Sequence, residues 1–94
     1  MKTEYILDLV EFGAKVADVC EEGVISYFNL DRNNEEDIEF AKAIGYETAR
    51  RVVKDILDGT VNIDISATDE QTVAIIEELI MKHLNEVVKE IGQR

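Results

Sequence analysis

The last third of the chain repeats apolar residues over a wider arc than one helix-to-helix contact uses. In residues 69–91, apolar side chains recur at steps of three and four, the spacing of one face of an α-helix. A second strip beside the first widens the apolar face, so this helix needs two neighbours. The first strip consists of Val73, Ile76, Ile80, Leu84, Val87 and Ile91, and the second of Ile75, Leu79 and Val88.

The chain is long enough for a single domain with a small core. A chain of 94 residues buries roughly two-thirds of its unfolded surface, so pairing of subunits would add useful stability. Hydrophobic residues at 46% and charged residues at 33% are typical of a folded protein. We therefore expect residues 1–94 to form one helical domain.

Two further helices follow from the same periodicity. Residues 3–29 place an apolar stripe and an acidic stripe on opposite faces of a helix. Residues 34–58 follow asparagines that can cap a helix, and they end at Gly59, a residue suited to a helix C-terminus. With residues 69–91, these segments predict an all-α, antiparallel three-helix bundle that self-associates, with a dimer as the expected assembly.

The connection between the second and third predicted helices has the spacing of a strand. In residues 61–65, Val61, Ile63 and Ile65 alternate with polar residues. A short strand is not stable alone. The segment either lies extended with its apolar side chains closing one end of the bundle, or pairs with its copy in a second subunit.

Small residues repeat every four positions in the first two predicted helices. Gly13 and Ala17 have this spacing in the first helix, and Ala41, Gly45 and Ala49 have it in the second. Such positions let two helix backbones approach closely. We expect these two helices to pack tightly together, with a self-association groove through the same residues as the alternative.

The formal net charge of −11 limits the kinds of partner. Phosphate-backbone binding normally uses clustered Lys and Arg, and the one basic cluster here is Arg50, Arg51 and Lys54. Direct nucleic-acid binding is therefore not expected, and an anionic membrane surface would repel the chain. No uncharged apolar run is long enough to span a bilayer, and no signal peptide is evident, so we expect a cytoplasmic protein.

The acidic stripe of the first predicted helix is a candidate docking surface. Three interpretations are open for it: a solvated face, a surface that docks a basic protein, or a mimic of a nucleic-acid phosphate backbone. Together with the bundle, it favours a non-enzymatic interaction protein, such as an adaptor, regulator or inhibitor of a protein partner. The carboxylates of the stripe are Glu4, Asp8, Glu11, Asp18 and Glu22.

An acidic turn at residues 35–39 suggests an enzymatic alternative. Glu35, Glu36 and Glu39 could project carboxylates to a magnesium ion from one helical turn. The string resembles the first half of the acidic motif of all-α, MazG-like nucleotide pyrophosphohydrolases, and that resemblance implies magnesium-dependent nucleotide hydrolysis. The second half departs from the pattern, because Asp55 and Asp58 lie on the same helix, about 24 Å away at 1.5 Å per residue. Without a metal, the same acids would complement the helix dipole.

The remaining candidates are a histidine and an aromatic cluster. His83 is the single histidine, and with Cys20 it supplies too few ligands for zinc, so we expect a structural or exposed role. A pocket for a ligand or for a partner's side chain could form where the first two helices connect, although the same residues could simply close the core. These residues are Tyr27, Phe28, Arg32 and Phe40.

Two surfaces remain to be assigned from the pattern. If the first two helices bury each other, Ile75, Leu79 and Val88 have no obvious partner inside the chain, which predicts a subunit interface through them. A small-ligand site at such an interface is a further alternative.

The outer face of the second predicted helix carries charges of alternating sign. Glu47, Arg51 and Asp55 are four residues apart and are expected to pair along this face.

Overall fold

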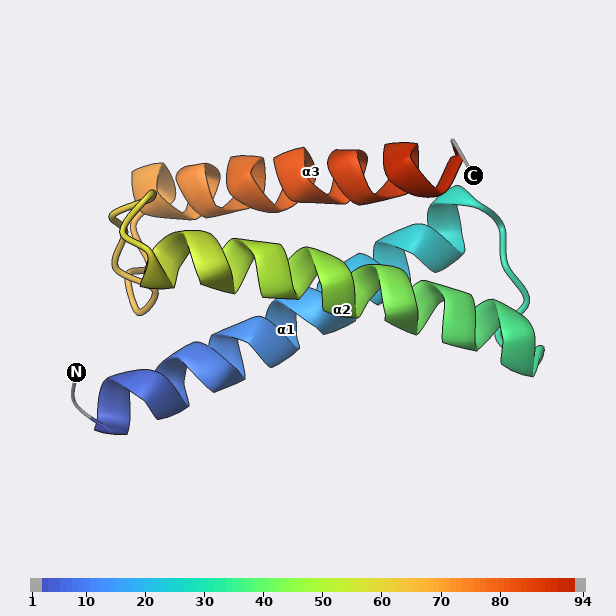
Figure 1. The fold of residues 1–94 in the computed structure, drawn as a ribbon, viewed down its shortest axis with the longest axis horizontal. Coiled ribbons are helices and arrows are strands. Elements are labelled where there is room, and N and C mark those ends of the chain that lie inside the picture. Colours follow the sequence, from blue (N-terminus) through green and yellow to red (C-terminus); the bar gives the residue numbers. More distant parts are fainter. Residues whose placement is uncertain (1–2, 93–94) are drawn as a thin grey trace.

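The chain folds into three helices that run antiparallel in sequence order (Figure 1). The computed structural model describes the backbone of residues 3–92 and the side chains of residues 8–92. The helices are α1 (Thr3–Tyr27), α2 (Glu35–Leu57) and α3 (Glu70–Gly92), and residues 3–92 contain no strand. The predicted all-α three-helix bundle is confirmed, and each predicted boundary lies within two residues of the observed one. None of the described helices is long and apolar enough to cross a membrane.

The helix ends follow from short polar residues and from Asn29 and Gly59, which have positive φ after α1 and α2. The side-chain oxygen of Asn34 accepts hydrogen bonds from the backbone N–H groups of Glu36 and Asp37 at 2.9 and 3.2 Å. Two donors that the first turn of α2 leaves free are thereby satisfied. After α2, Gly59 has a φ of 75°, a conformation that glycine adopts without strain.

The start of α3 differs from the capping pattern that the sequence indicates. Thr68 and Gln71 have the spacing of a capping box. In the structure, Asp69 takes this role instead, since its Oδ2 accepts hydrogen bonds from both the backbone N–H and the hydroxyl of Thr72. A carboxylate at this position also suits the positive end of the helix dipole.

The close contact expected between the first two helices is present at Gly45. A Cβ at this position would lie 2.6 Å from the carbonyl oxygen of Ala17 and 3.3 Å from the backbone nitrogen of Glu21. Both neighbours are backbone atoms, so there is no flexible side chain that could move aside. The fit of α1 against α2 therefore requires glycine at position 45.

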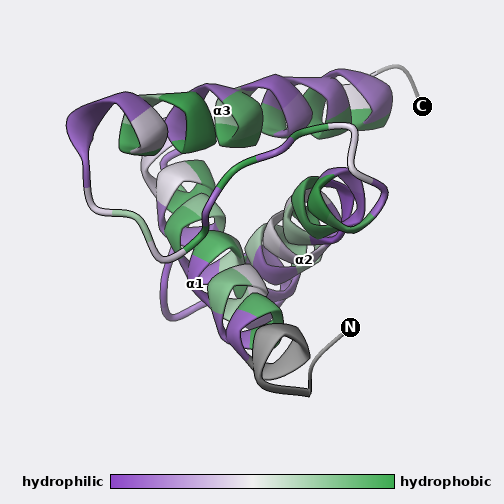
Figure 2. Cartoon of the chain, turned by 90° about the vertical axis from the view of Figure 1, so that its left-hand side faces the viewer, coloured by the Kyte–Doolittle hydropathy of each residue, from purple (hydrophilic) through white to green (hydrophobic). Residues whose placement is uncertain are grey.

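Helix α2 is the central element of the bundle. It packs along α1 on one side and along α3 on another, whereas contact between α1 and α3 is slight. Figure 2 shows the apolar residues of the helices turned toward the interior. The largest fully buried side chains are Ile44, Val24, Val52, Thr48 and Cys20, all of which belong to α1 or α2. Most of the core therefore lies on the α1–α2 side.

The segment that connects α2 to α3 packs against the same core. Val61, Ile63 and Ile65 are half-buried against a cluster that includes Leu9, Val16 and Leu79. The chain turns at residues 64–67, where the backbone N–H of residue 67 bonds to the carbonyl of residue 64 at 3.1 Å. The alternating apolar residues thus pack within their own chain, and pairing with a second copy stays a prediction.

The close contact of α1 and α2 at Gly45 gives a first test of the fold. We expect Gly45→Ala to lower the free energy of unfolding by about 1–3 kcal/mol, because the new methyl group meets the backbone of α1. This loss should occur although alanine is favoured over glycine inside a helix by about 1 kcal/mol. Urea denaturation followed by circular dichroism measures the change.

Gly23→Ala is the matched control, because it makes the same change where the added Cβ would have no neighbour within 4 Å. Gly23 lines a surface hollow, so both variants are compared at a low protein concentration of about 1 µM, where the chain is expected to be monomeric. Helix propensity then acts alone at this position, and we expect unchanged or slightly higher stability. Equal stability changes in the two variants would contradict the close approach of α1 and α2.

Candidate interaction surfaces

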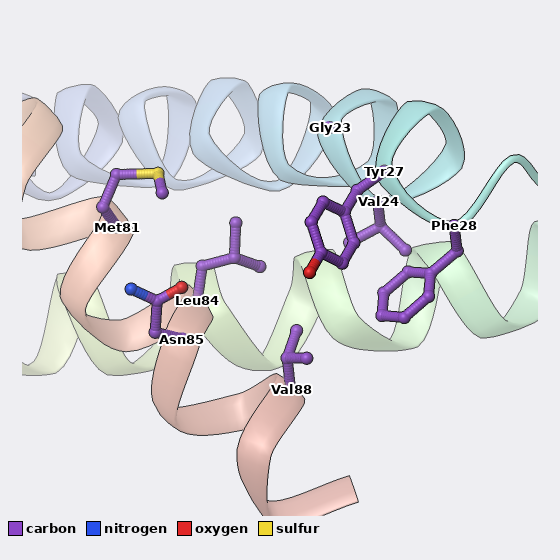
Figure 3. Close-up of a pocket in the computed structure, with 8 residues that line it drawn as sticks. All are labelled: Gly23, Val24, Tyr27, Phe28, Met81, Leu84, Asn85 and Val88. Atoms are coloured by element: carbon purple, nitrogen blue, oxygen red, sulfur yellow. The ribbon is translucent and has the colours of Figure 1, made fainter. Parts of the chain in front are cut away.

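An apolar groove lies on the side of the bundle where α1 and α3 face each other without close packing (Figure 3). Its volume is about 290 Å³. The groove remains open because α3 packs mainly on α2. We call it the α1–α3 groove. The residues that line it are Gly23, Val24, Tyr27, Phe28, Met81, Leu84, Asn85 and Val88.

Two large side chains of this groove, those of Tyr27 and Met81, are exposed to solvent. The exposed fraction is 81% for Tyr27 and 52% for Met81, although both are bulky and largely apolar. Figure 3 shows Tyr27 reaching from α1 toward α3, while Leu84 and Val88 point back toward α1. The ring of Tyr27 meets that of Phe28 edge-on, with centroids 4.9 Å apart. This geometry is favourable for two aromatic rings and orients Tyr27 beside the groove.

A second, smaller hollow adjoins the groove. It has a volume of about 150 Å³ and shares Phe28 and Val88 with the groove. Phe40 of α2 belongs to this hollow, and its ring centroid lies 6.0 Å from that of Phe28. None of the described residues that line the two hollows is charged.

The predicted pocket residues are brought together only in part. Tyr27, Phe28 and Phe40 form a continuous aromatic series, as the ring contacts show. Arg32 is not among the lining residues of either hollow, because its guanidinium forms two hydrogen bonds with the carboxylate of Glu22, at 2.6 and 3.0 Å. The expected aromatic and basic pocket is therefore an aromatic and uncharged one.

The three residues predicted to form one subunit interface do not share a face. Leu79 is buried in the core, with 7% of its surface exposed, so the expectation that it lacks a partner in its own chain was wrong. Ile75 and Leu79 lie beside Val61, whereas Val88 lines the α1–α3 groove. Leu79 and Val88 are nine positions apart in the sequence, which places them on opposite sides of a helix with about 100° per residue. Self-association itself stays a prediction.

The predicted docking stripe of α1 is an exposed acidic face. Asp8, Glu11 and Asp18 are all exposed to solvent, and we call these three the α1 acidic face. Glu22 is exposed as well, but Arg32 neutralises it. The side chain of Glu4 lies outside the described residues.

The acids considered for magnesium lie exposed in the first turn of α2. Glu35, Glu36 and Glu39 are all exposed. Their neighbour Asp37 accepts a hydrogen bond from the backbone N–H of Asp31 at 2.9 Å, which ties the turn before α2 to the helix. Among the described residues, no group of three or more His, Cys, Asp or Glu side chains is placed to hold a metal ion.

A polar network joins α2 to α3 on the side away from the groove. The Nη1 atom of Arg51 lies 2.6 Å from Glu90 of α3, and its Nε atom lies 3.0 Å from Glu47 of α2. The expected pair of Glu47 and Arg51 therefore forms, but it belongs to a contact between helices. Asp55 contacts His83 instead of Arg51.

His83 is the buried part of this network, with 7% of its surface exposed. Its Nε2 lies 2.7 Å from Oδ2 of Asp55, and its Nδ1 lies 3.3 Å from Oε2 of Glu86. Both ring nitrogens can donate to these carboxylates only when the imidazole is doubly protonated. The structural role expected for His83 thus takes a definite form, a hydrogen-bonded link between α2 and α3.

Ionisation in the network and in the core follows local contacts. Hydrogen bonds from Arg50 and then Arg51 lower the pKa of Glu47 to about 2. Hydrogen bonds with Glu90 and Glu47 raise the pKa of Arg51, so its positive charge is secure. Burial raises the pKa of the Cys20 thiol to about 11, which keeps it protonated and unreactive.

No protein-family model matches the chain, and the searches of curated proteins and of solved structures found no match either.

The lowered pKa of Glu47 predicts a pH-dependent contribution to stability. Its carboxylate is ionised more readily in the folded state, so its contribution is complete above the ordinary value of 4.5 and is lost as the pH falls toward about 2. We expect Glu47→Gln to cost about 1 kcal/mol at pH 7 and almost nothing near pH 2. Urea denaturation of both proteins across this pH range measures the difference.

Glu39→Gln serves as a control, because it removes an exposed carboxylate from the same helix. We expect its effect at pH 7 to stay within about 0.5 kcal/mol. A cost for Glu47→Gln that is the same at every pH would show that the ion pairs of Glu47 do not stabilise the fold.

Proposed function

We propose that this protein is a non-enzymatic interaction protein, an adaptor, regulator or inhibitor, that docks a basic protein partner on the α1 acidic face. The observation that carries the proposal is the exposure of Asp8, Glu11 and Asp18 on a helix whose opposite side packs against α2. The carboxylates are thus held on a regular, supported helix and need no rearrangement to meet a partner.

Charge supports a basic partner in particular. The chain has 21 acidic and 10 basic residues, and its net charge of −11 attracts cationic surfaces over a distance of about one Debye length. Complementary charge raises the association rate and selects against acidic competitors more than it adds affinity. Lys15 interrupts the acidic face, so it is a patterned surface rather than a uniform one.

A cytoplasmic location belongs to the same proposal. The single cysteine, Cys20, is a buried free thiol, which suits a reducing compartment. Nucleotide hydrolysis through Glu35, Glu36 and Glu39 is not proposed, since the described residues bring no second group of ligands to them.

The test removes three carboxylates from the docking face. The variant Asp8→Asn/Glu11→Gln/Asp18→Asn changes the net charge from −11 to −8. Proteins captured from an extract by the wild-type chain are first identified, and the affinity of each purified basic protein is then measured. We expect this variant to bind about tenfold more weakly, because three exposed ion pairs at about 0.5 kcal/mol each contribute about 1.5 kcal/mol.

The matched control is Glu35→Gln/Glu36→Gln/Glu39→Gln, which removes the same number of charges from α2 and also from the candidate magnesium turn. This control variant should bind the basic partner with the affinity of the wild type. Added salt should weaken the binding of the partner to the wild type and to the control variant. Equal losses in the two variants would mean that the net charge alone attracts the partner, and the α1 acidic face would then not be the docking site.

A further inference from the structure

The α1–α3 groove and the hollow beside it form one surface without a charged lining residue. The two share Phe28 and Val88, so they are continuous. We call this surface the uncharged face. Charged residues make up 33% of the chain, so a face of this extent without them needs an explanation. Exposed apolar patches of this kind commonly mark interaction sites.

We propose that the uncharged face binds the same face of a second copy of this chain, and that the protein forms a symmetric dimer. Each copy carries a net charge of −11, so two copies repel each other when acidic surfaces approach. None of the residues that line the uncharged face is a carboxylate, so contact through them adds no repulsion between carboxylates of the lining. A basic partner would instead gain most at the α1 acidic face, so the two surfaces suit different occupants.

The shape of the face also suits pairing with itself. A two-fold interface is self-complementary, so one surface must carry both the projecting and the receiving groups. Tyr27 projects with 81% of its surface exposed, and Met81 with 52%. The groove of about 290 Å³ lies directly beside them and can receive the Tyr27 ring of a partner copy. Tyrosine and methionine are among the residues enriched in protein interfaces.

The extent of the face sets the expected strength. It runs from Met81 to Gly92 along α3, about 18 Å at 1.5 Å per residue. From the other helices it includes only the end of α1 from Gly23, with Phe28, and Phe40 and Ile44 of α2. A face of this size would bury an area at the small end of the range for specific protein interfaces. We therefore expect a dimer that dissociates on dilution, with a dissociation constant on the order of micromolar.

The test measures mass against concentration by sedimentation equilibrium. The wild type should shift from the 10.6 kDa monomer toward twice that mass between about 1 µM and 1 mM. Tyr27→Lys should raise the dissociation constant at least tenfold, because a lysine would have to be buried in the partner's groove. Tyr46→Lys is the control, since Tyr46 is 68% exposed on α2 and does not line the uncharged face.

Backbone amide spectra at low and high concentration give a second readout that needs no variant. Concentration-dependent shifts should concentrate in residues 23–28 and 81–92 and at Phe40 and Ile44. A chain that stays monomeric up to about 1 mM would overturn the proposal. So would native mass spectrometry that finds a small apolar molecule bound to the wild type but not to Tyr27→Lys. A dimer weakened equally by both substitutions would also overturn it. These results are independent of the α1 acidic face, so either proposal can fail alone.

Discussion

The approach of the α1 and α2 backbones at Gly45 governs the arrangement of the other elements. A Cβ there would lie 2.6 Å from the Ala17 carbonyl, so the two helices are as close as their main chains allow. This closeness lets Ile44, Val52 and Val24 fill the space on either side of the contact and become fully buried. Two helices packed this closely leave no space between them for a third helix, so α3 packs on one side of the pair.

Polar contacts then determine how α3 is rotated. Its apolar arc is wide, so apolar packing alone would tolerate several rotations about the helix axis. The contacts of His83 with Asp55 and of Arg51 with Glu90 are directional and require one register against α2. A largely buried polar pair such as His83 with Asp55 contributes little net stability but can specify one arrangement. In this arrangement Met81 and Val88 face α1 across an open groove.

The sequence predicted the local features of the fold but not which surfaces the helices share. Helix ends and the turn at Gly59 follow from periodicity and caps, which act within a few residues. The contact of Gly45 with Ala17 joins residues 28 apart, but small residues at every fourth position marked it in both helices. The contact of His83 with Asp55, which orients α3, spans the same distance in the sequence, and no repeated spacing marks it. A charged stripe has the same spacing whether it meets water or another helix. For this reason Arg51 was expected on the outer face.

Whether a candidate surface could be predicted also depended on which helices contact each other. The α1 acidic face was predictable, because a stripe of carboxylates along one helix faces solvent unless a cationic surface covers it. The groove required knowledge of which side of α3 stays uncovered, and the polar Asn85 within it interrupted the apolar pattern. Met81, Leu84 and Val88 do have helical spacing, but that spacing is equally typical of core residues.

The two proposed surfaces share no residue, so a single chain could use both at once. Two copies joined through the uncharged face would present two α1 acidic faces in one assembly. A basic partner with two or more binding segments would then meet the second face at a high effective concentration. Weak pairing of the chain would thereby strengthen a docking contact that is itself weak, because exposed ion pairs contribute little individually. The separation of an uncharged face from an acidic one would therefore link the proposed self-association to the proposed partner binding.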